Sequence, residues 1–372
     1  MKILHVINSL GLGGAERLIS DLVPMFNKHY KCDVLLLRET DLIGTKEKTL
    51  IDILEDKNIK VSILSKKSLY KFNFLFKIRD IIKDYDLVHS HLFPSQYWLV
   101  FSSMILARNK RPILITTEHN TYNRRRKIPF FKVLDRFVYN RYDKIISISQ
   151  MTDDALIQYS KLSEDKTIII ENGVNLSIFK KASPNKDILK NYHLHDKYLL
   201  VQVAGFRDQK DQDTLIRALP LLPDKMVAVF AGVGKRIEQC KNLATQLGVS
   251  ARCVFLGKVK NVESLLKLSD LVIISSHWEG FGLVAIEGMA SGIPIIASNV
   301  PGLSQVVSGA GLLFTKSSTQ ELVNKILELY NDDDFYSRVS TACIKRAEEY
   351  SIDNMANQYL NLYNTFLNNE SN

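Results

Sequence analysis

Short apolar runs alternate with longer segments of helical spacing along the whole chain, and this alternation constrains the fold more than any other feature. In the first half, strands are predicted at 2–8, 33–37, 60–64, 86–91, 112–118, 143–148 and 167–171. Helices are predicted near 15–29, 70–84, 94–107, 127–141 and 150–159. The second half repeats the scheme, with strands near 198–204, 226–231, 252–256, 271–275, 293–297 and 311–314. Continuous apolar runs are typical of parallel strands covered on both faces, so the pattern predicts an α/β fold of doubly wound sheets.

The length of 372 residues exceeds what a single hydrophobic core usually supports, so two domains are expected. A polar stretch interrupted by Pro184 marks the boundary, which assigns 1–178 to an N-terminal domain and 190–350 to a C-terminal domain. A last helix within 351–372 has an apolar face that could pack back on the N-terminal domain or cap the other one. Ligands of such sheets bind at the carboxyl ends of the strands, where two sheets would enclose a cleft.

Composition excludes several classes of protein. No run of about 18 uncharged apolar residues is present, and the first apolar run is broken by His5 and Asn8, which favours a buried strand over a signal peptide. A cytoplasmic protein is therefore expected. The cysteines are too scattered for a disulfide framework or a zinc site. Residues 1–175 carry 28 Lys and Arg against 20 Asp and Glu, which indicates an acidic partner there or merely a solubilising surface.

The segment 279–294 carries most of the chemical information. It follows one predicted strand and precedes another, and its glycines would expose backbone N–H groups at a helix start, which suits a diphosphate. Glu279 lies in the turn and Glu287 in the helix, so one carboxylate can face a sugar and the other a ribose. The alternative is that both are ordinary helix-start and surface carboxylates. A dinucleotide loop at 8–15 is weakly supported, because Glu16 stands where the motif has its third glycine.

The spacing of Glu279 and Glu287, followed by Gly-x-Pro at 292–294, closely resembles the donor site of the retaining family-4 glycosyltransferases of the GT-B fold. Further motifs of that family occur in the expected order over nearly the whole chain, at 13–17, 89–91, 118–120 and 172–175. The resemblance implies two Rossmann-like domains facing across a cleft. The N-terminal domain would bind the acceptor and the C-terminal domain the nucleotide-sugar donor.

The resemblance also implies roles for individual residues. Glu279 and His119 would contact the donor sugar, Glu287 the ribose, and Lys210 the diphosphate. The remaining donor-binding positions are Gly13, Gly14, Gly280, Phe281, Gly282 and Leu283. Arg207 departs from the family pattern, because the usual arginine lies two positions earlier, where this chain has Gly205. Two cations after a strand could stabilise a departing nucleoside diphosphate in place of a metal.

His119 ends an apolar run, where a lone histidine is more often structural than catalytic. By resemblance it would orient the sugar hydroxyls and stabilise an oxocarbenium-like state, while the donor phosphate takes the acceptor proton. His91 would support this region, and a structural role for it stays equally open. The acidic motif 211–213 lies at the start of a predicted helix, where aspartates favour the helix dipole, and 332–334 is interpreted as a cap between two helices. No metal site and no cofactor are therefore predicted.

The basic segment 124–141 combines cations with phenylalanines near His119. A nucleic-acid patch is disfavoured because no RNA-binding signature accompanies it. The alternatives are a core-facing helix with a solvated basic face, or docking on the inner membrane surface, which we favour. The enzyme would thereby reach a polyprenyl-diphosphate-linked glycan acceptor.

Together with the residues above, the resemblance implies a metal-independent retaining transferase that moves a hexose or N-acetylhexosamine from a UDP-sugar in cell-surface polysaccharide synthesis. A sugar-nucleotide epimerase of the same fold and an inactive nucleotide-sugar-binding protein are the alternatives.

Overall fold

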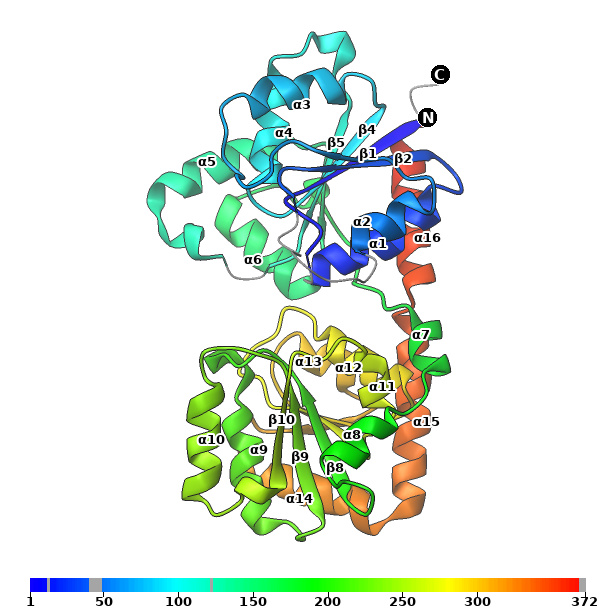
Figure 1. Cartoon of the computed structure of the whole chain (residues 1–372). Helices are drawn as coiled ribbons and strands as arrows, with labels where there is room; N and C mark the ends of the chain where they lie inside the picture. The colour runs from blue at the N-terminus through cyan, green and yellow to red at the C-terminus, as the bar shows by residue number, and fades with distance from the viewer. Residues whose placement is uncertain (12–13, 40–48, 121–122, 368–372) are drawn as a thin grey trace. The chain divides into compact units, whose positions relative to one another are not determined.

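The computed structural model describes residues 1–372 apart from 12–13, 40–48, 121–122 and 368–372 (Figure 1). The chain divides into two compact units. The first unit consists of Met1–Gly173 together with the C-terminal segment from Ile352, and the second consists of Val174–Ser351. Residues 174–178, assigned to the N-terminal domain from the sequence, therefore belong to the second unit.

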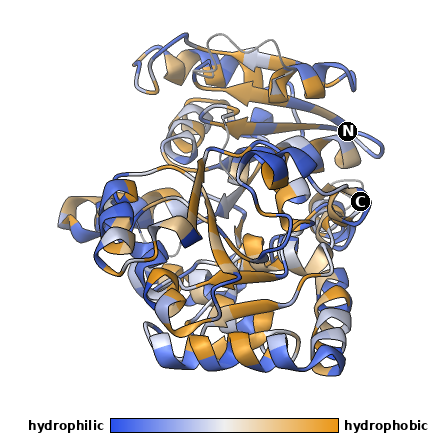
Figure 2. Ribbon diagram, turned by 60° about the horizontal axis from the view of Figure 1, so that its bottom comes forward, coloured by the Kyte–Doolittle hydropathy of each residue, from blue (hydrophilic) through white to orange (hydrophobic). Residues whose placement is uncertain are grey.

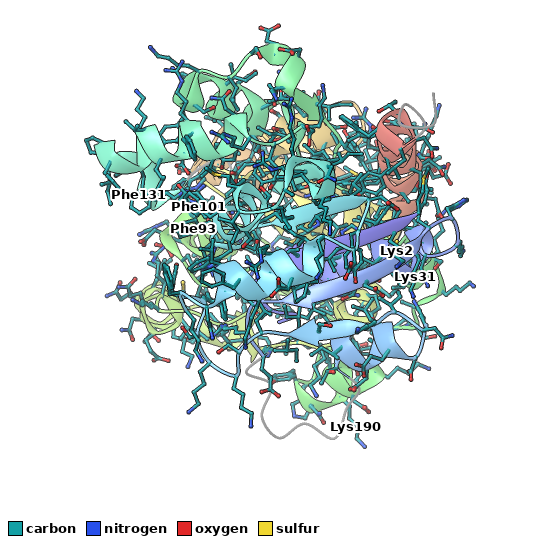
Figure 3. All side chains as sticks on the ribbon, turned by 90° about the horizontal axis from the view of Figure 1, so that it is seen from above. Lys2, Lys31, Phe93, Phe101, Phe131 and Lys190 are labelled. Atoms are coloured by element: carbon teal, nitrogen blue, oxygen red, sulfur yellow. The ribbon has the colours of Figure 1, made fainter. Side chains whose placement is uncertain are left out.

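The described part of the first unit holds a parallel sheet with the order β3-β2-β1-β4-β5-β6-β7. Its strands are β1 (Lys2–Ile7), β2 (Lys31–Leu36), β3 (Val61–Ile63), β4 (Leu87–His91), β5 (Ile113–Glu118), β6 (Lys144–Ser147) and β7 (Thr167–Ile169). Lys2 and Lys31 are register partners at the amino ends of β1 and β2, and their labels lie together in Figure 3. The strand order reverses between β1 and β4, so the loops that follow these two strands turn away from each other.

Helices cover both faces of this sheet. They are α1 (Gly14–Phe26), α2 (Leu50–Glu55), α3 (Phe74–Ile82), α4 (Ser95–Met104), α5 (Pro129–Asn140), α6 (Gln150–Ser160) and α16 (Ile352–Leu367). One buried cluster joins the sheet to α1, α2 and α16. A second cluster joins the opposite face to α3, α4, α5 and α6. The strands are largely hydrophobic in Figure 2, as expected for a sheet buried on both sides.

The C-terminal helix α16 belongs to the first unit, which the sequence left undecided. It lies beside α1 in Figure 1 and buries Met355, Tyr359 and Tyr363 against the sheet. The phenol rings of Tyr359 and Tyr363 pack against Phe26 of α1 at centroid distances of 5.9 and 5.4 Å. The last helix of the chain thus completes the core of the unit in which the chain begins.

The second unit is a similar parallel sheet, with the order β10-β9-β8-β11-β12-β13 in its described residues. The strands are β8 (Tyr198–Val203), β9 (Met226–Ala231), β10 (Cys253–Gly257), β11 (Leu271–Ile274), β12 (Ile295–Ser298) and β13 (Leu312–Phe314). The helices are α7 (Leu176–Lys181), α8 (Lys186–Asn191), α9 (Gln212–Ala218), α10 (Ile237–Gln246), α11 (Val262–Leu266), α12 (Leu283–Ala290), α13 (Leu303–Val307), α14 (Thr319–Asn331) and α15 (Asp333–Glu349). The order reverses between β8 and β11.

The predicted fold class, two Rossmann-like α/β domains with parallel sheets, is confirmed. Every strand predicted from an apolar run coincides with an observed strand, with ends that differ by a few residues. Within the described ranges, none of the helices combines the length and apolar character that crossing a membrane would require.

Replacing Tyr359 by alanine tests the role of α16. The ring is 1% exposed, so its removal leaves a cavity and should lower the free energy of unfolding by about 3–5 kcal/mol. Urea unfolding followed by circular dichroism measures this loss. The matched control is Asn361→Ala on the exposed side of the same helix, which should change stability by less than about 0.5 kcal/mol. Equal effects of the two substitutions would contradict the packing of α16.

Candidate functional site

The loops after β8 and β11 leave neighbouring strands at the point where the strand order of the second unit reverses. Open α/β sheets bind ligands at such carboxyl ends. The loop after β8 carries Arg207 and Lys210, and the loop after β11 carries Glu279. The sheet therefore brings together the cations and the carboxylate that the sequence singled out.

An ion pair joins Lys210 Nζ to Glu279 Oε1, and the side chains of both are largely buried. Ser276 Oγ donates to the same carboxylate oxygen at 2.7 Å. The two loops are also joined near their backbones. Ser275 Oγ, directly after β11, donates to the Asp211 carbonyl of the β8 loop at 2.6 Å. Gln202 Nε2, on β8, donates to Ser275 Oγ at 3.0 Å and to the Lys210 carbonyl at 2.9 Å. These bonds fix an ammonium and a carboxylate side by side at the sheet edge.

Arg207 is exposed at the start of the turn that contains Lys210. Its Nε lies 3.7 Å from the position that a Cβ on Gly205 would occupy. The side chain of Arg207 therefore lies close to residue 205, the position at which the family-4 glycosyltransferases have their arginine. Because Gly205 has no side chain, the shifted arginine can fold back over it.

Two glycines shape the turn before α12. Gly282 has φ +89° at the N-terminus of α12, a conformation that favours glycine. Gly302, with φ +87°, contacts the Glu279 loop so closely that a Cβ there would lie 2.4 Å from the Glu279 carbonyl oxygen. Gly302 was not among the residues predicted from the sequence, although the dipeptide Pro301-Gly302 is a turn signal.

The remaining residues of the second unit that were predicted to bind a donor lie around this turn. Phe281 is buried and its ring contacts Tyr350 edge-on at 5.5 Å. Gly280 and Leu283 are half-buried. Glu287 is also half-buried, on the second turn of α12. The first turn of α12 supplies the N–H groups that the sequence predicted at this edge.

In the first unit, Gly13 lies outside the described residues, and Gly14 is the first residue of α1. His119 follows β5 directly and is half-buried. Its Nε2 lies 3.3 Å from Nδ1 of His91, and Nε2 of His91 lies 3.2 Å from Nδ1 of His5. No role was predicted for His5, although its register partner on β4 is His89 and the two side chains point to the same face of the sheet.

Burial keeps these histidines neutral at physiological pH. It lowers the pKa of His5 to about 3 and the pKa of His119 to about 4. Burial, followed by the neighbouring histidines, also holds the pKa values of His89 and His91 well below their ordinary range. A neutral imidazole has one N–H donor and one acceptor nitrogen, so His119 can orient hydroxyl groups by hydrogen bonding.

The described residues contain one group of side chains close enough to hold a metal ion, formed by His5, His89 and His91. Both ring nitrogens of His89 already have hydrogen-bond partners. Nδ1 lies 2.6 Å from the Tyr363 hydroxyl, and Nε2 lies 2.8 Å from Thr117 Oγ1. A metal bound here would have to displace one of these partners.

The acidic motifs make local contacts at the starts of two helices. Asp211 accepts a hydrogen bond from Thr214 Oγ1 at 2.7 Å at the start of α9, and Asp213 pairs with Arg236 at 2.7 Å. Asp332 caps α15 by accepting from the Phe335 amide at 2.7 Å.

The basic segment 124–141 is less basic at its surface than its sequence indicates. Arg125 is buried beside Asp135, with Nε 3.2 Å from the carboxylate, and Arg126 lies 3.4 Å from the Glu118 carboxylate. Phe131 is half-buried and contacts Phe93, which is labelled near it in Figure 3. The outer face of α5 instead exposes an apolar stripe flanked by cations, formed by Phe130, Val133 and Phe137 with Lys132, Arg136 and Arg141.

Two family descriptions match the chain. Residues 12–178 match the family described as Glycosyltransferase Family 4, and residues 185–349 match the family described as Glycosyl transferases group 1. The chain is 30% identical to an uncharacterized glycosyltransferase of Methanocaldococcus jannaschii, over 59% of this chain and 59% of that protein's length. It is 27% identical to a D-inositol 3-phosphate glycosyltransferase of Corynebacterium aurimucosum, over 75% of this chain and 72% of that protein.

Solved structures share the fold. The Anabaena protein HepE, crystallised with UDP and glucose, has a TM-score of 0.82 at 22% identity, covering 98% of this chain and 100% of its own. A glycosyltransferase from Rickettsia africae has a TM-score of 0.82 at 20% identity, covering 98% of each chain.

Substitution of Gly302 by alanine should damage the site without removing a functional side chain. A Cβ would overlap the Glu279 carbonyl, and alanine disfavours a positive φ, so the Glu279 loop must move. We expect the unfolding free energy to fall by more than about 1 kcal/mol and binding of nucleoside diphosphate to weaken, as measured by calorimetry. Gly248→Ala is the control, because it shares a positive φ but has open space around it. Unchanged nucleotide binding in Gly302→Ala would contradict the role of this contact.

The buried histidines should make the first unit sensitive to acid. Their folded pKa values lie below the unfolded value near 6.5, so the unfolded chain binds more protons and stability falls as pH drops below about 6.5. Each titrating histidine contributes up to about 1.4 kcal/mol per pH unit. Urea unfolding between about pH 7 and about pH 5 measures the slope. His5→Asn should flatten it, whereas replacement of the exposed His195 by asparagine should not.

Proposed function

Because the chain belongs to the group 1 glycosyltransferases of the GT-B fold, we propose that it transfers a sugar from a nucleoside-diphosphate donor to an acceptor hydroxyl. The observation that carries the proposal is the ion pair between Lys210 and Glu279, held where β8 and β11 diverge. An ammonium group suits a diphosphate, and a carboxylate suits the hydroxyl groups of a sugar. A single small site thereby offers complementary groups to both halves of a nucleotide sugar.

The proposed reaction breaks the bond between the anomeric carbon and the diphosphate oxygen. The acceptor oxygen forms the new bond to that carbon, and its proton passes to the departing phosphate oxygen. Lys210 and Arg207 stabilise the negative charge that develops on the leaving group. With attack on the face that the leaving group vacates, the anomeric configuration is retained. The cations supply the charge stabilisation for which other transferases use a metal ion.

The other site residues would bind the donor. Glu279 accepts hydrogen bonds from the transferred sugar, and Glu287 accepts them from the ribose. His119, neutral because of burial, donates to a sugar hydroxyl. The glycines at 280 and 282 let the diphosphate approach the backbone at the start of α12. A uridine donor is favoured because the structurally similar HepE was crystallised with UDP and glucose.

We further propose that the acceptor is a glycan on a polyprenyl diphosphate at the inner membrane surface. The supporting observation is the outer face of α5, where Phe130 and Val133 are 69% and 74% exposed next to Lys132 and Arg136. An exposed apolar stripe with flanking cations is typical of helices that lie on anionic membranes. Docking there would bring the enzyme to a lipid-linked acceptor.

The donor site is tested with UDP-, GDP- and ADP-sugars in the presence and absence of EDTA. One donor should raise the melting temperature and support slow release of nucleoside diphosphate that EDTA does not abolish. Lys210→Ala should lower kcat about 100- to 1000-fold, because the leaving group loses its cation. Lys241→Ala, on the exposed side of α10, is the control. Loss of activity in EDTA would contradict the metal-free mechanism, and no response to any donor would favour a degenerate site.

Membrane docking is tested by flotation with vesicles of phosphatidylcholine, with and without phosphatidylglycerol. The wild type should bind the anionic vesicles at low salt, and Lys132→Glu with Arg136→Glu should weaken binding by about 1 kcal/mol or more for each charge. The control reverses two exposed lysines of α8, Lys186 and Lys190. Equal loss in both double variants would indicate a general charge effect and contradict docking through α5.

A further inference from the structure

Three histidines of the first unit form a continuous series of ring contacts that ends at His119. His5 lies on β1 and His91 at the end of β4, and the planes of their rings are nearly parallel, with an interplanar angle of 15°. The nitrogen pairs are 3.2 Å apart between His5 and His91, and 3.3 Å apart between His91 and His119. Each contact joins an Nδ1 to an Nε2, so the series has a direction.

We propose that His5 and His91 are positioning residues that fix the tautomer of His119 through this series of hydrogen bonds, with the proton on Nδ1 of each ring. The inference deepens the proposed function, since it concerns how His119 binds the sugar. It adds a role for two residues that would not touch the substrate.

Proton counting leaves only two arrangements. All three rings are neutral, so each has one N–H and one lone pair. Either every ring is protonated on Nδ1, and hydrogen bonds are donated from His5 through His91 to His119, or every ring is protonated on Nε2, and the direction is reversed. A mixed series would place two protons or two lone pairs in one contact.

The buried end of the series selects between these arrangements. His5 is 1% exposed, and its Nε2 has no hydrogen-bond partner. In the Nε2 arrangement that nitrogen would carry an unpaired buried N–H, which folded proteins rarely tolerate. In the Nδ1 arrangement it carries only an unpaired lone pair. The Nδ1 arrangement is therefore favoured at His5 and is imposed on His91 and His119 in turn.

The Nδ1 arrangement determines which ring nitrogen of His119 can donate a hydrogen bond. Its Nε2 is held as the acceptor of the His91 proton, and its Nδ1 carries the hydrogen. His119 then offers a donor to a sugar oxygen and cannot remove a proton there, which agrees with the role proposed above. The other tautomer would present a lone pair in place of a proton, and the hydrogen bond to the same oxygen would be lost.

A buried metal ion is the competing interpretation of the histidine cluster. It is disfavoured because the series engages both nitrogens of His91, while Tyr363 and Thr117 engage both nitrogens of His89. A metal ion would need lone pairs that these contacts already use. It would also leave His119 without its donor.

The test uses the full chain with ¹⁵N-labelled histidine and reads the protonation of each ring nitrogen by long-range ¹H–¹⁵N correlation. The wild type should have His119 protonated on Nδ1. His5→Phe keeps an aromatic ring beside Phe26 but removes the first donor, so His119 should become a mixture of tautomers. His5→Asn places an amide N–H where Nδ1–H was and should restore the wild-type spectrum.

We expect kcat to change in the same variants in which the tautomer of His119 changes. With the best donor, His5→Phe should lower kcat about three- to tenfold with little change in KM, and His5→Asn should recover most of it. Tyr363→Phe is the control for a purely structural effect, because it removes a hydrogen bond to His89 outside the series. It should cost stability and leave the tautomer of His119 unchanged.

Two results would overturn the inference. One is an unchanged His119 tautomer in His5→Phe, and the other is stoichiometric binding of Zn²⁺ or Co²⁺ that is lost in His5→Phe. Failure of the proposed function is distinguishable from both, because the spectra report the tautomers even if no donor is turned over.

Discussion

The reversal of strand order between β8 and β11 is the constraint on which the candidate site depends. Strands are added in opposite directions on the two sides of this point, so the loops that follow β8 and β11 diverge and leave a crevice at the carboxyl ends of these strands. The strand order alone would not fix the loops after β8 and β11 relative to each other. Ser275, directly after β11, joins them by donating to the Asp211 carbonyl, and Gln202 of β8 donates to Ser275 Oγ. The Lys210–Glu279 ion pair forms between the same two loops. Topology provides the opening, and these hydrogen bonds provide its geometry.

The strand order of the first unit also reverses, between β1 and β4, but the side chains buried there are uncharged. His5 and His89 are register partners there, and α16 covers them with Tyr363. Because burial disfavours the charged imidazole, the rings stay neutral and bind one another through single hydrogen bonds. The two units thus share one sheet topology but place different kinds of side chain at the reversal of strand order. The second presents paired opposite charges, and the first presents oriented neutral donors.

The strands were predicted from the sequence more accurately than the contacts between side chains. Apolar runs located every strand, but they do not mark where pairing ends, so the run at 167–171 exceeds β7. The place of α16 was undecidable, because an apolar helix face fits either core equally well. Lys210 and Glu279 were identified by motif, and their pairing is observed. Gly302 and His5 were missed because each acts through a neighbour distant in sequence, the Glu279 loop in one case and His91 in the other.

The basic segment illustrates the same limit in electrostatic terms. Counting charges treats every cation as available, but Arg125 and Arg126 neutralise Asp135 and Glu118 inside the first unit. What reaches solvent is a smaller set of cations beside exposed apolar side chains on α5. Such a surface differs in kind from a purely basic patch, because salt screens only its charges. Its apolar part would keep contributing to membrane binding at ionic strengths that abolish a purely electrostatic association, so the salt dependence of docking should be shallow.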